Sequence, residues 1–149
     1  MKRRDFTRIM GKFTLAGPVL FPLAASAAEG AEIDWHQEMP AAWRSMRNEQ
    51  RPMLLFVTMD GCTHCRRMES QTYRDQRVIG RVRSSFVAAA INGPRQPEVA
   101  RRLGVRVYPT TLIISPEYRV IASIRGYVPP DELTARLAAV SERLATNRR

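Results

Sequence analysis

The chain has 149 residues, enough for one domain with a hydrophobic core, and its 44% hydrophobic and 26% charged residues are typical of a soluble globular protein. The net charge is +10, of which residues 1–27 carry +4 from five basic residues and one acidic residue, so that +6 remains. In the remainder every basic residue is an arginine. Because these arginines are scattered, without a long run or interleaved aromatic residues, the charge does not indicate a nucleic-acid partner, and we expect none.

The N-terminal segment, residues 1–27, has the pattern of a secretory signal peptide. A basic start is followed by an apolar run over residues 13–25 and by the small triplet Ala25-Ser26-Ala27, which predicts a mature start near Ala28. The run is shorter than the about 20 residues of a membrane-spanning helix. Contact with a membrane through an uncleaved signal is therefore the less favoured alternative, and residues 28–149 are expected to form one domain.

The basic part of this segment resembles the twin-arginine export signal, because Arg3-Arg4 precede the apolar residue Phe6. Thr7 stands where that pattern usually has leucine, so general secretion remains open as the export route. Either route predicts export into a bacterial cell envelope, and we expect the periplasm. That compartment permits disulfides.

The first half of the mature chain predicts a short extended segment and a helix within residues 33–51. The near-continuous apolar run at residues 52–59 predicts a strand that is buried on both faces and ends at the turn Asp60-Gly61. A helix is expected to begin at the cysteines, to break near Asp75 and to restart. Its candidate buried residues are Met68, Tyr73, Val78, Ile79 and Val82.

The second half predicts three further strands and two further helices. The strands are expected at 86–91, 110–116 and 119–126, and the helices at 97–105 and 129–145. The short link at Pro116-Glu117 predicts that the last two strands are antiparallel. The order of the elements indicates an α/β fold, in which a mixed sheet carries helices on both faces.

The two cysteines of the chain, Cys62 and Cys65, are separated by two residues and lie after a predicted strand and at a helix start, which is a redox arrangement. Backbone amides and the positive end of the helix favour a thiolate at Cys62, and so we expect its pKa to be lowered. Cys65 is within one turn and can resolve a mixed disulfide formed on Cys62. We therefore assign Cys62 as the nucleophile and Cys65 as the resolving cysteine.

The two spacer residues, Thr63 and His64, are the candidate tuning residues. A protonated His64 places positive charge near the thiolate of Cys62 and stabilises the reduced form, which makes the disulfide a stronger oxidant. The alternative is that His64 is a solvated side chain with little electronic effect.

Other uses of the cysteine pair need different partners. A structural zinc site needs four ligands, and outside the pair the sequence offers His64 in the spacer and His36, so we expect no zinc site. Copper(I) bound by the two thiolates is harder to exclude, because soft metals bind thiolates. A purely structural disulfide would close a very small loop and constrain the unfolded chain little. Redox exchange is the favoured interpretation, with no cofactor beyond the Cys62–Cys65 disulfide.

Three stretches carry a resemblance to a known family: RPMLLFVTMDGCTHCRRME, GVRVYPTTLIISPEYRVI and RGYVPPDEL. On these, the chain resembles the thioredoxin superfamily, and within it the bacterial envelope proteins akin to the C-terminal domain of the thiol:disulfide interchange protein DsbD. The resemblance covers roughly residues 33–144. It implies a thioredoxin-like α/β fold with a central mixed sheet of four to five strands, flanked by helices on both faces.

The resemblance also implies a function, thiol-disulfide exchange with protein thiols and disulfides of the cell envelope, and an electron-donating thiol-disulfide protein as a second partner. Pro109 corresponds to the cis proline of the family, and Tyr108 with Pro109 would form a substrate-docking loop beside Cys62. Phe56 stands where thioredoxin has a buried aspartate, so that water, Asp60 or His64 would have to accept the proton of Cys65. The family suggests a reductase, whereas His64 suggests an oxidant.

Overall fold

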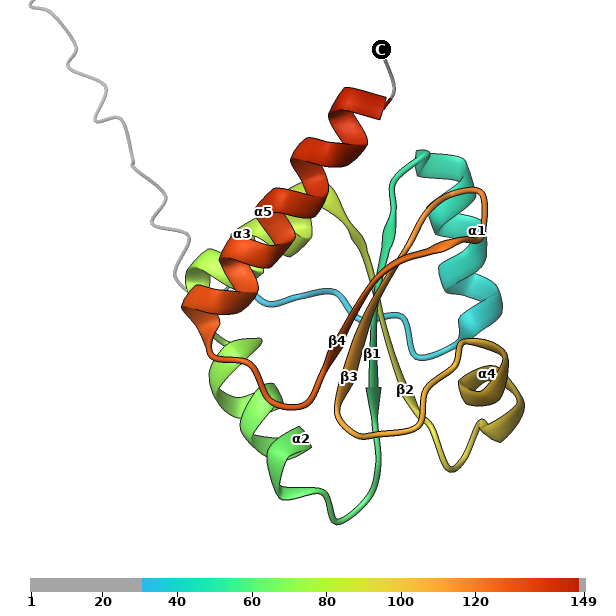
Figure 1. Ribbon diagram of the computed structural model, residues 1–149, viewed down its shortest axis with the longest axis vertical. Helices are drawn as coiled ribbons and strands as arrows, with labels where there is room; N and C mark the ends of the chain where they lie inside the picture. The colour runs from blue at the N-terminus through green and yellow to red at the C-terminus, as the bar shows by residue number, and fades with distance from the viewer. Residues whose placement is uncertain (1–30, 148–149) are drawn as a thin grey trace, which may run out of the picture.

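The computed structural model describes residues 31–147, so the expected signal peptide, residues 1–27, and the start of the expected mature chain lie outside the described residues. The described chain forms a mixed four-stranded sheet, in the order β2-β1-β3-β4, with helices on both faces (Figure 1). The strands are β1 (Met53–Thr58), β2 (Val87–Asn92), β3 (Thr110–Ile114) and β4 (Val120–Arg125). The helices are α1 (Met39–Glu49), α2 (Thr63–Arg67), α3 (Gln76–Ser85), α4 (Pro97–Arg102) and α5 (Pro130–Asn147).

The central strand β1 is paired on both sides, parallel to β2 and antiparallel to β3. Its side chains alternate between two hydrophobic clusters, with Leu54 and Phe56 in one and Met53, Leu55 and Val57 in the other. The sequence prediction of a strand buried on both faces is therefore confirmed. A single parallel bridge between His36 and Ala89 extends the sheet beyond β2.

The two faces of the sheet carry different helices. α2, α3 and α5 lie on one face, and α1 and α4 on the other (Figure 1). This layered arrangement confirms the predicted α/β fold. The first face buries side chains from both halves of the chain: Met68, Val78, Ile79, Val82, Leu133, Leu137 and Val140.

The predicted break near Asp75 is present, and a segment that the sequence did not reveal precedes it. Between α2 and α3, residues Met68–Thr72 form one turn of π-helix. Its last residue, Thr72, is fully buried and its hydroxyl donates a 2.7 Å hydrogen bond to the carbonyl of Val128. The amide of Val128 in turn donates to the sulfur of Met68 at 3.4 Å. Contacts with a segment more than fifty residues away thus hold this turn, which local spacing cannot predict.

Helix α5 runs away from the part of the molecule that holds the cysteines. Its C-terminal residues lie on the opposite side of the molecule from the start of α2 (Figure 1). Among the described helices, none is both long and apolar enough to cross a membrane.

Asp75 caps α3 and gives the first testable prediction. Its carboxylate accepts a 2.9 Å hydrogen bond from the amide of Arg77, and the Arg77 guanidinium holds the pKa of Asp75 below its usual range. Loss of an N-cap costs about 1 kcal/mol, so Asp75→Ala should lower the free energy of unfolding by about that amount at pH 7. Because the folded-state pKa lies below the unfolded value of about 3.9, the charge-dependent part is complete above about pH 5 and is lost as the pH falls through the folded-state pKa.

Urea unfolding between pH 7 and pH 3 measures this dependence. Asp75→Asn is the matched control, because asparagine keeps the cap acceptor without the charge. At pH 7 its free energy of unfolding should lie below that of wild type by less than that of Asp75→Ala, and this difference should disappear at low pH. A deficit of Asp75→Asn that is the same at both pH values would contradict the prediction.

Candidate active site

The structure joins Cys62 and Cys65 in a disulfide, with their Cα atoms 5.2 Å apart. The two cysteines are not equally exposed. Cys62 is half-buried at the surface, whereas Cys65 is 1% exposed and belongs to the hydrophobic cluster beneath α2. An incoming thiol or disulfide therefore meets Cys62 first, and Cys65 lies behind it.

The local backbone explains why Cys62 lies at the surface. β1 ends at Thr58, and the chain turns through Gly61, whose φ of 71° is a left-handed conformation that glycine adopts without steric cost. Cys62 is the N-cap of α2, and its sulfur accepts a 3.1 Å hydrogen bond from the amide of Cys65. In the reduced protein the same amide would stabilise a thiolate at Cys62, because a hydrogen bond to the charged form favours it.

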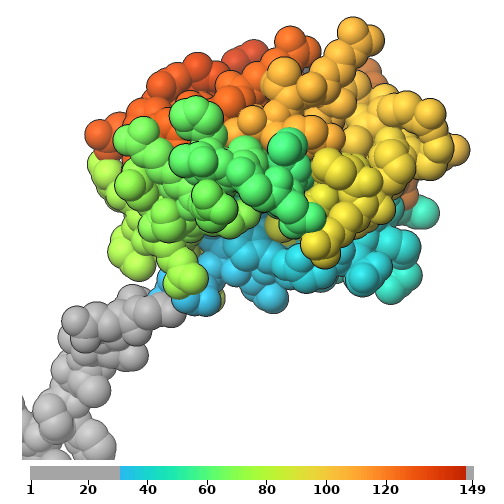
Figure 2. All heavy atoms as spheres, turned by 90° about the horizontal axis from the view of Figure 1, so that it is seen from below, coloured from blue at the N-terminus to red at the C-terminus, as the bar shows by residue number. Residues whose placement is uncertain are grey.

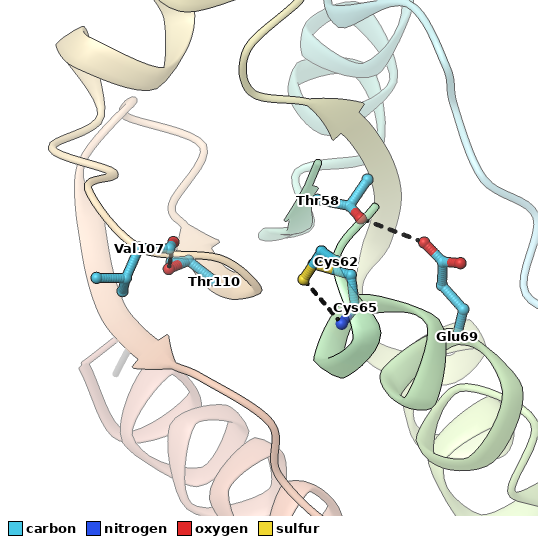
Figure 3. The surroundings of a disulfide bond; sticks show 6 residues. All are labelled: Thr58, Cys62, Cys65, Glu69, Val107 and Thr110. Carbon is cyan, nitrogen blue, oxygen red and sulfur yellow. Dashed lines mark hydrogen bonds between the residues drawn. A yellow bond between two sulfur atoms is a disulfide. The ribbon is translucent and has the colours of Figure 1, made fainter. Parts of the chain in front are cut away.

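A second loop faces the disulfide. Pro109 is buried, and the peptide bond between Tyr108 and Pro109 is cis. The hydroxyl of Thr110 donates to the carbonyl of Val107 at 2.8 Å and closes the turn that contains these two residues. Figure 3 shows this turn opposite Cys62. The sequence placed Tyr108 and Pro109 beside Cys62 through a resemblance, and the structure brings them to the same end of the molecule.

Around these two loops the surface combines several segments distant in sequence. Figure 2 shows α2 beside the chain that follows β2 and the chain that precedes β3. Two large apolar side chains near the disulfide are exposed, Met59 at 38% and Val107 at 47%. Both belong to the loops that bear Cys62 and Pro109, so the surface beside the disulfide includes apolar contact area.

The spacer residues Thr63 and His64 are both exposed. Within residues 31–147, no hydrogen bond or ion pair to another side chain holds the imidazole of His64, so any influence it has on Cys62 depends on its charge and proximity. The next basic residues, Arg66 and Arg67, are both exposed, and the guanidinium of Arg67 lies 4.2 Å over the ring of Tyr127.

Phe56 stands where thioredoxin has a buried aspartate, and it belongs to a cluster of aromatic side chains. Phe56 is 2% exposed, its ring centroid is 5.0 Å from that of Tyr73 and 6.2 Å from that of Trp35. The hydroxyl of Tyr73 pairs with that of Thr111 at 2.6 Å, and burial raises the pKa of Tyr73 well above its usual range. Tyr73 therefore stays neutral, and β1 offers no carboxylate beneath the disulfide.

Two carboxylates near the cysteines come from other positions. Asp60, in the loop before Cys62, forms a 2.9 Å ion pair with Arg95. Glu69 follows Cys65 by four residues, and its carboxylate accepts a 3.4 Å hydrogen bond from the hydroxyl of Thr58 (Figure 3). Asp60 was predicted from the sequence as a candidate proton acceptor, and Glu69 was not, although its four-residue spacing after Cys65 on a predicted helix was a usable signal.

A cavity of about 330 Å³ lies beside Glu69 and Phe56. It is lined by the aromatic side chains of Trp35, Phe56 and Tyr73 and by the polar side chains of Thr58 and Glu69. Within the part of the chain that the structure describes, no three His, Cys, Asp or Glu side chains cluster so that they could hold a metal ion.

A family profile described as a thioredoxin-like domain matches residues 39–141. The chain belongs to the thioredoxin-like family. The resemblance inferred from the sequence is thus confirmed, and the matched region includes both cysteines, Tyr108 and Pro109. A Cys-x-x-Cys disulfide in a thioredoxin-like domain is the arrangement of a thiol-disulfide oxidoreductase.

Solved structures share this fold. A thioredoxin from Thermus thermophilus is 23% identical, with a TM-score of 0.67, and the match covers 73% of this chain and 87% of that one. The oxidoreductase DsbH is 17% identical, with a TM-score of 0.63, and the match covers 91% of this chain and 95% of that one. The reduced C-terminal domain of Neisseria meningitidis DsbD is 17% identical, with a TM-score of 0.60, and the match covers 68% of this chain and 92% of that one. No curated protein sequence matched the chain.

The unequal exposure of the cysteines gives a second prediction. After reduction, a limiting amount of iodoacetamide should modify Cys62 at least about tenfold faster than Cys65, because reaction needs an accessible thiolate. Tandem mass spectrometry of the peptide that carries both cysteines measures the two rates. Equal modification of the two residues would show that Cys62 is not the accessible nucleophile.

Proposed function

We propose that this thioredoxin-like protein is a periplasmic thiol-disulfide oxidoreductase that reduces disulfides in specific proteins of the cell envelope. The observation that carries the proposal is the half-buried Cys62 opposite the loop of Tyr108 and Pro109, bonded to the fully buried Cys65. This arrangement provides an attacking atom, a surface beside it and a resolving atom within one turn.

The reaction begins with the dithiol. The Cys62 thiolate attacks one sulfur of a partner disulfide, the partner's S–S bond breaks, and the released partner sulfur takes up a proton. The thiol of Cys65 then loses its proton and attacks the sulfur of Cys62, which reforms the Cys62–Cys65 disulfide and releases the second partner thiol. Two electrons pass from the dithiol to the partner. A second thiol-disulfide protein returns the chain to the dithiol form by the reverse exchange.

The docking loop supplies the contacts that distinguish a protein substrate from a small thiol. In this proposal an extended segment of the partner lies along Tyr108 and Pro109, so that its disulfide meets the sulfur of Cys62. The exposed side chains of Met59 and Val107 add apolar contact area on either side. Such contacts hold the reacting sulfur atoms in line, which is how orientation accelerates exchange.

The proposed location depends on residues 1–27, whose pattern predicts export, and on the need of a disulfide substrate for an oxidising compartment. Among the proteins whose structures share the fold, DsbH is described as an oxidoreductase.

Reduction of insulin by dithiothreitol tests the activity and is the third prediction. The wild-type protein should accelerate insulin precipitation, and Cys62→Ser should not, because it lacks the attacking thiolate. Cys65→Ser should turn over poorly and accumulate a mixed disulfide on Cys62, visible on a non-reducing gel. Equal rates for wild type and Cys62→Ser would remove the proposed activity.

The reduction potential tests the direction of electron flow and is the fourth prediction. We expect a value above that of thioredoxin, about −270 mV, because a positive charge at His64 stabilises the thiolate of the reduced form. His64→Ala should lower the potential by about 30 mV, equal to about tenfold in the equilibrium constant. Thr63→Ala, a change in the uncharged spacer residue, should shift it less.

Equilibration with glutathione buffers measures these potentials. A wild-type value at or below that of thioredoxin, or one that His64→Ala leaves unchanged, would mean that His64 has no electronic effect. A value far above it would favour the alternative direction, in which the protein donates its disulfide to partners.

A further inference from the structure

The ring of Tyr108 lies directly on the backbone of Gly93, the buried residue that follows β2. A Cβ atom built on Gly93 would stand 2.5 Å from Cε1, 2.6 Å from the hydroxyl oxygen and 2.8 Å from Cζ of this ring. Non-bonded carbon atoms do not approach so closely, since their attraction is optimal at about 3.5–4.0 Å. The ring can lie here only because Gly93 has no side chain. The φ of Gly93 is not in the left-handed region, so its backbone conformation does not itself require glycine.

The loop that begins with Gly93 is fixed on its other side to the segment that bears the cysteines. The amide of Gly93 donates a 2.8 Å hydrogen bond to the carbonyl of Thr58, the last residue of β1. Two residues later, Arg95 pairs with Asp60 at 2.9 Å. The Arg95–Asp60 pair is exposed and adds little stability. Together with the backbone hydrogen bond, it places this loop against the chain that leads into Cys62.

Tyr108 has little freedom to avoid a larger residue at position 93. Its ring is rigid, its side chain is half-buried, and it packs against both hydrophobic clusters. Because the neighbouring Pro109 is buried, a displaced ring must either shift the backbone of the docking loop or swing out toward solvent. In each case the surface beside Cys62 changes.

We infer that Gly93 is a positioning residue for the exchange reaction: the loop at residues 93–96 is bonded to the chain that leads into Cys62, and its glycine sets where the docking loop lies relative to Cys62 by receiving the ring of Tyr108. The inference rests on the proposed function, since it concerns how a protein disulfide is seated on Tyr108 and Pro109. Gly93 itself does not touch the reacting sulfur atoms.

The test compares wild type with Gly93→Ala in two reactions. With insulin as the protein disulfide, kcat/KM should fall at least about tenfold, since a misplacement of about 1 Å can cost about 10²-fold. With dithiothreitol alone, the rate at which the Cys62–Cys65 disulfide is reduced should stay within about twofold of wild type, because a small thiol needs no docking loop.

Two matched variants separate positioning from a general effect on the fold. Gly80→Ala is the control for glycine replacement, because Gly80 is exposed in α3 and a Cβ there meets nothing within 4 Å. It should leave both rates unchanged. In a Tyr108→Ala background, Gly93→Ala should have no further effect on either rate, because the ring that it displaces is gone.

The outcomes are distinguishable. A Gly93→Ala variant as active on insulin as wild type, or a double variant slower than Tyr108→Ala alone, overturns the role of Gly93 while leaving the proposed function intact. Equal loss in the insulin and dithiothreitol reactions overturns it as well, since it indicates a damaged redox centre. If Gly93→Ala alone does not fold, the comparison of the double variant with Tyr108→Ala still decides. Wild-type protein no faster than Cys62→Ser removes the proposed function and this inference together.

Discussion

The pairing of β1 with a parallel strand on one side and an antiparallel strand on the other is the constraint on which the site depends. The C-terminal ends of β1 and β2 lie at the same edge of the sheet, and because β3 runs in the opposite direction, its start lies there too. Three loops therefore meet at one edge. They bear Cys62, Gly93 and Pro109, which are up to 47 positions apart in the sequence.

The burial of β1 fixes which residues can serve that edge. Alternate side chains enter the two hydrophobic clusters, so a polar residue in this strand would face a core rather than solvent. Phe56 fills its position with an aromatic ring that packs on Trp35 and Tyr73. Any proton that leaves Cys65 must therefore be taken up by water or by a group outside the strand. Glu69, which lines the cavity and accepts a hydrogen bond from Thr58, is a carboxylate outside the strand.

Much of the fold was predictable because its signals are local. The apolar run of β1, the helix break near Asp75 and the helix start at the cysteines each depend on residues within a few positions of one another, and all three have the expected structure. The π-helical turn and the contact between the ring of Tyr108 and Gly93 were not predictable. The first depends on the hydrogen bond from Thr72 to Val128, and the second on two loops that the sheet brings together. Neither contact leaves a periodic pattern in the sequence.

The direction of α5 has a practical consequence for the study of partners. Because its C-terminal end lies at the far end of the molecule from the start of α2, a linker attached there extends away from the disulfide (Figure 1). Beads or surfaces coupled through the C-terminus would leave the redox face open to large proteins. The same geometry suits a fusion in which a second domain follows the chain, since the added domain would not compete for the face that bears Cys62.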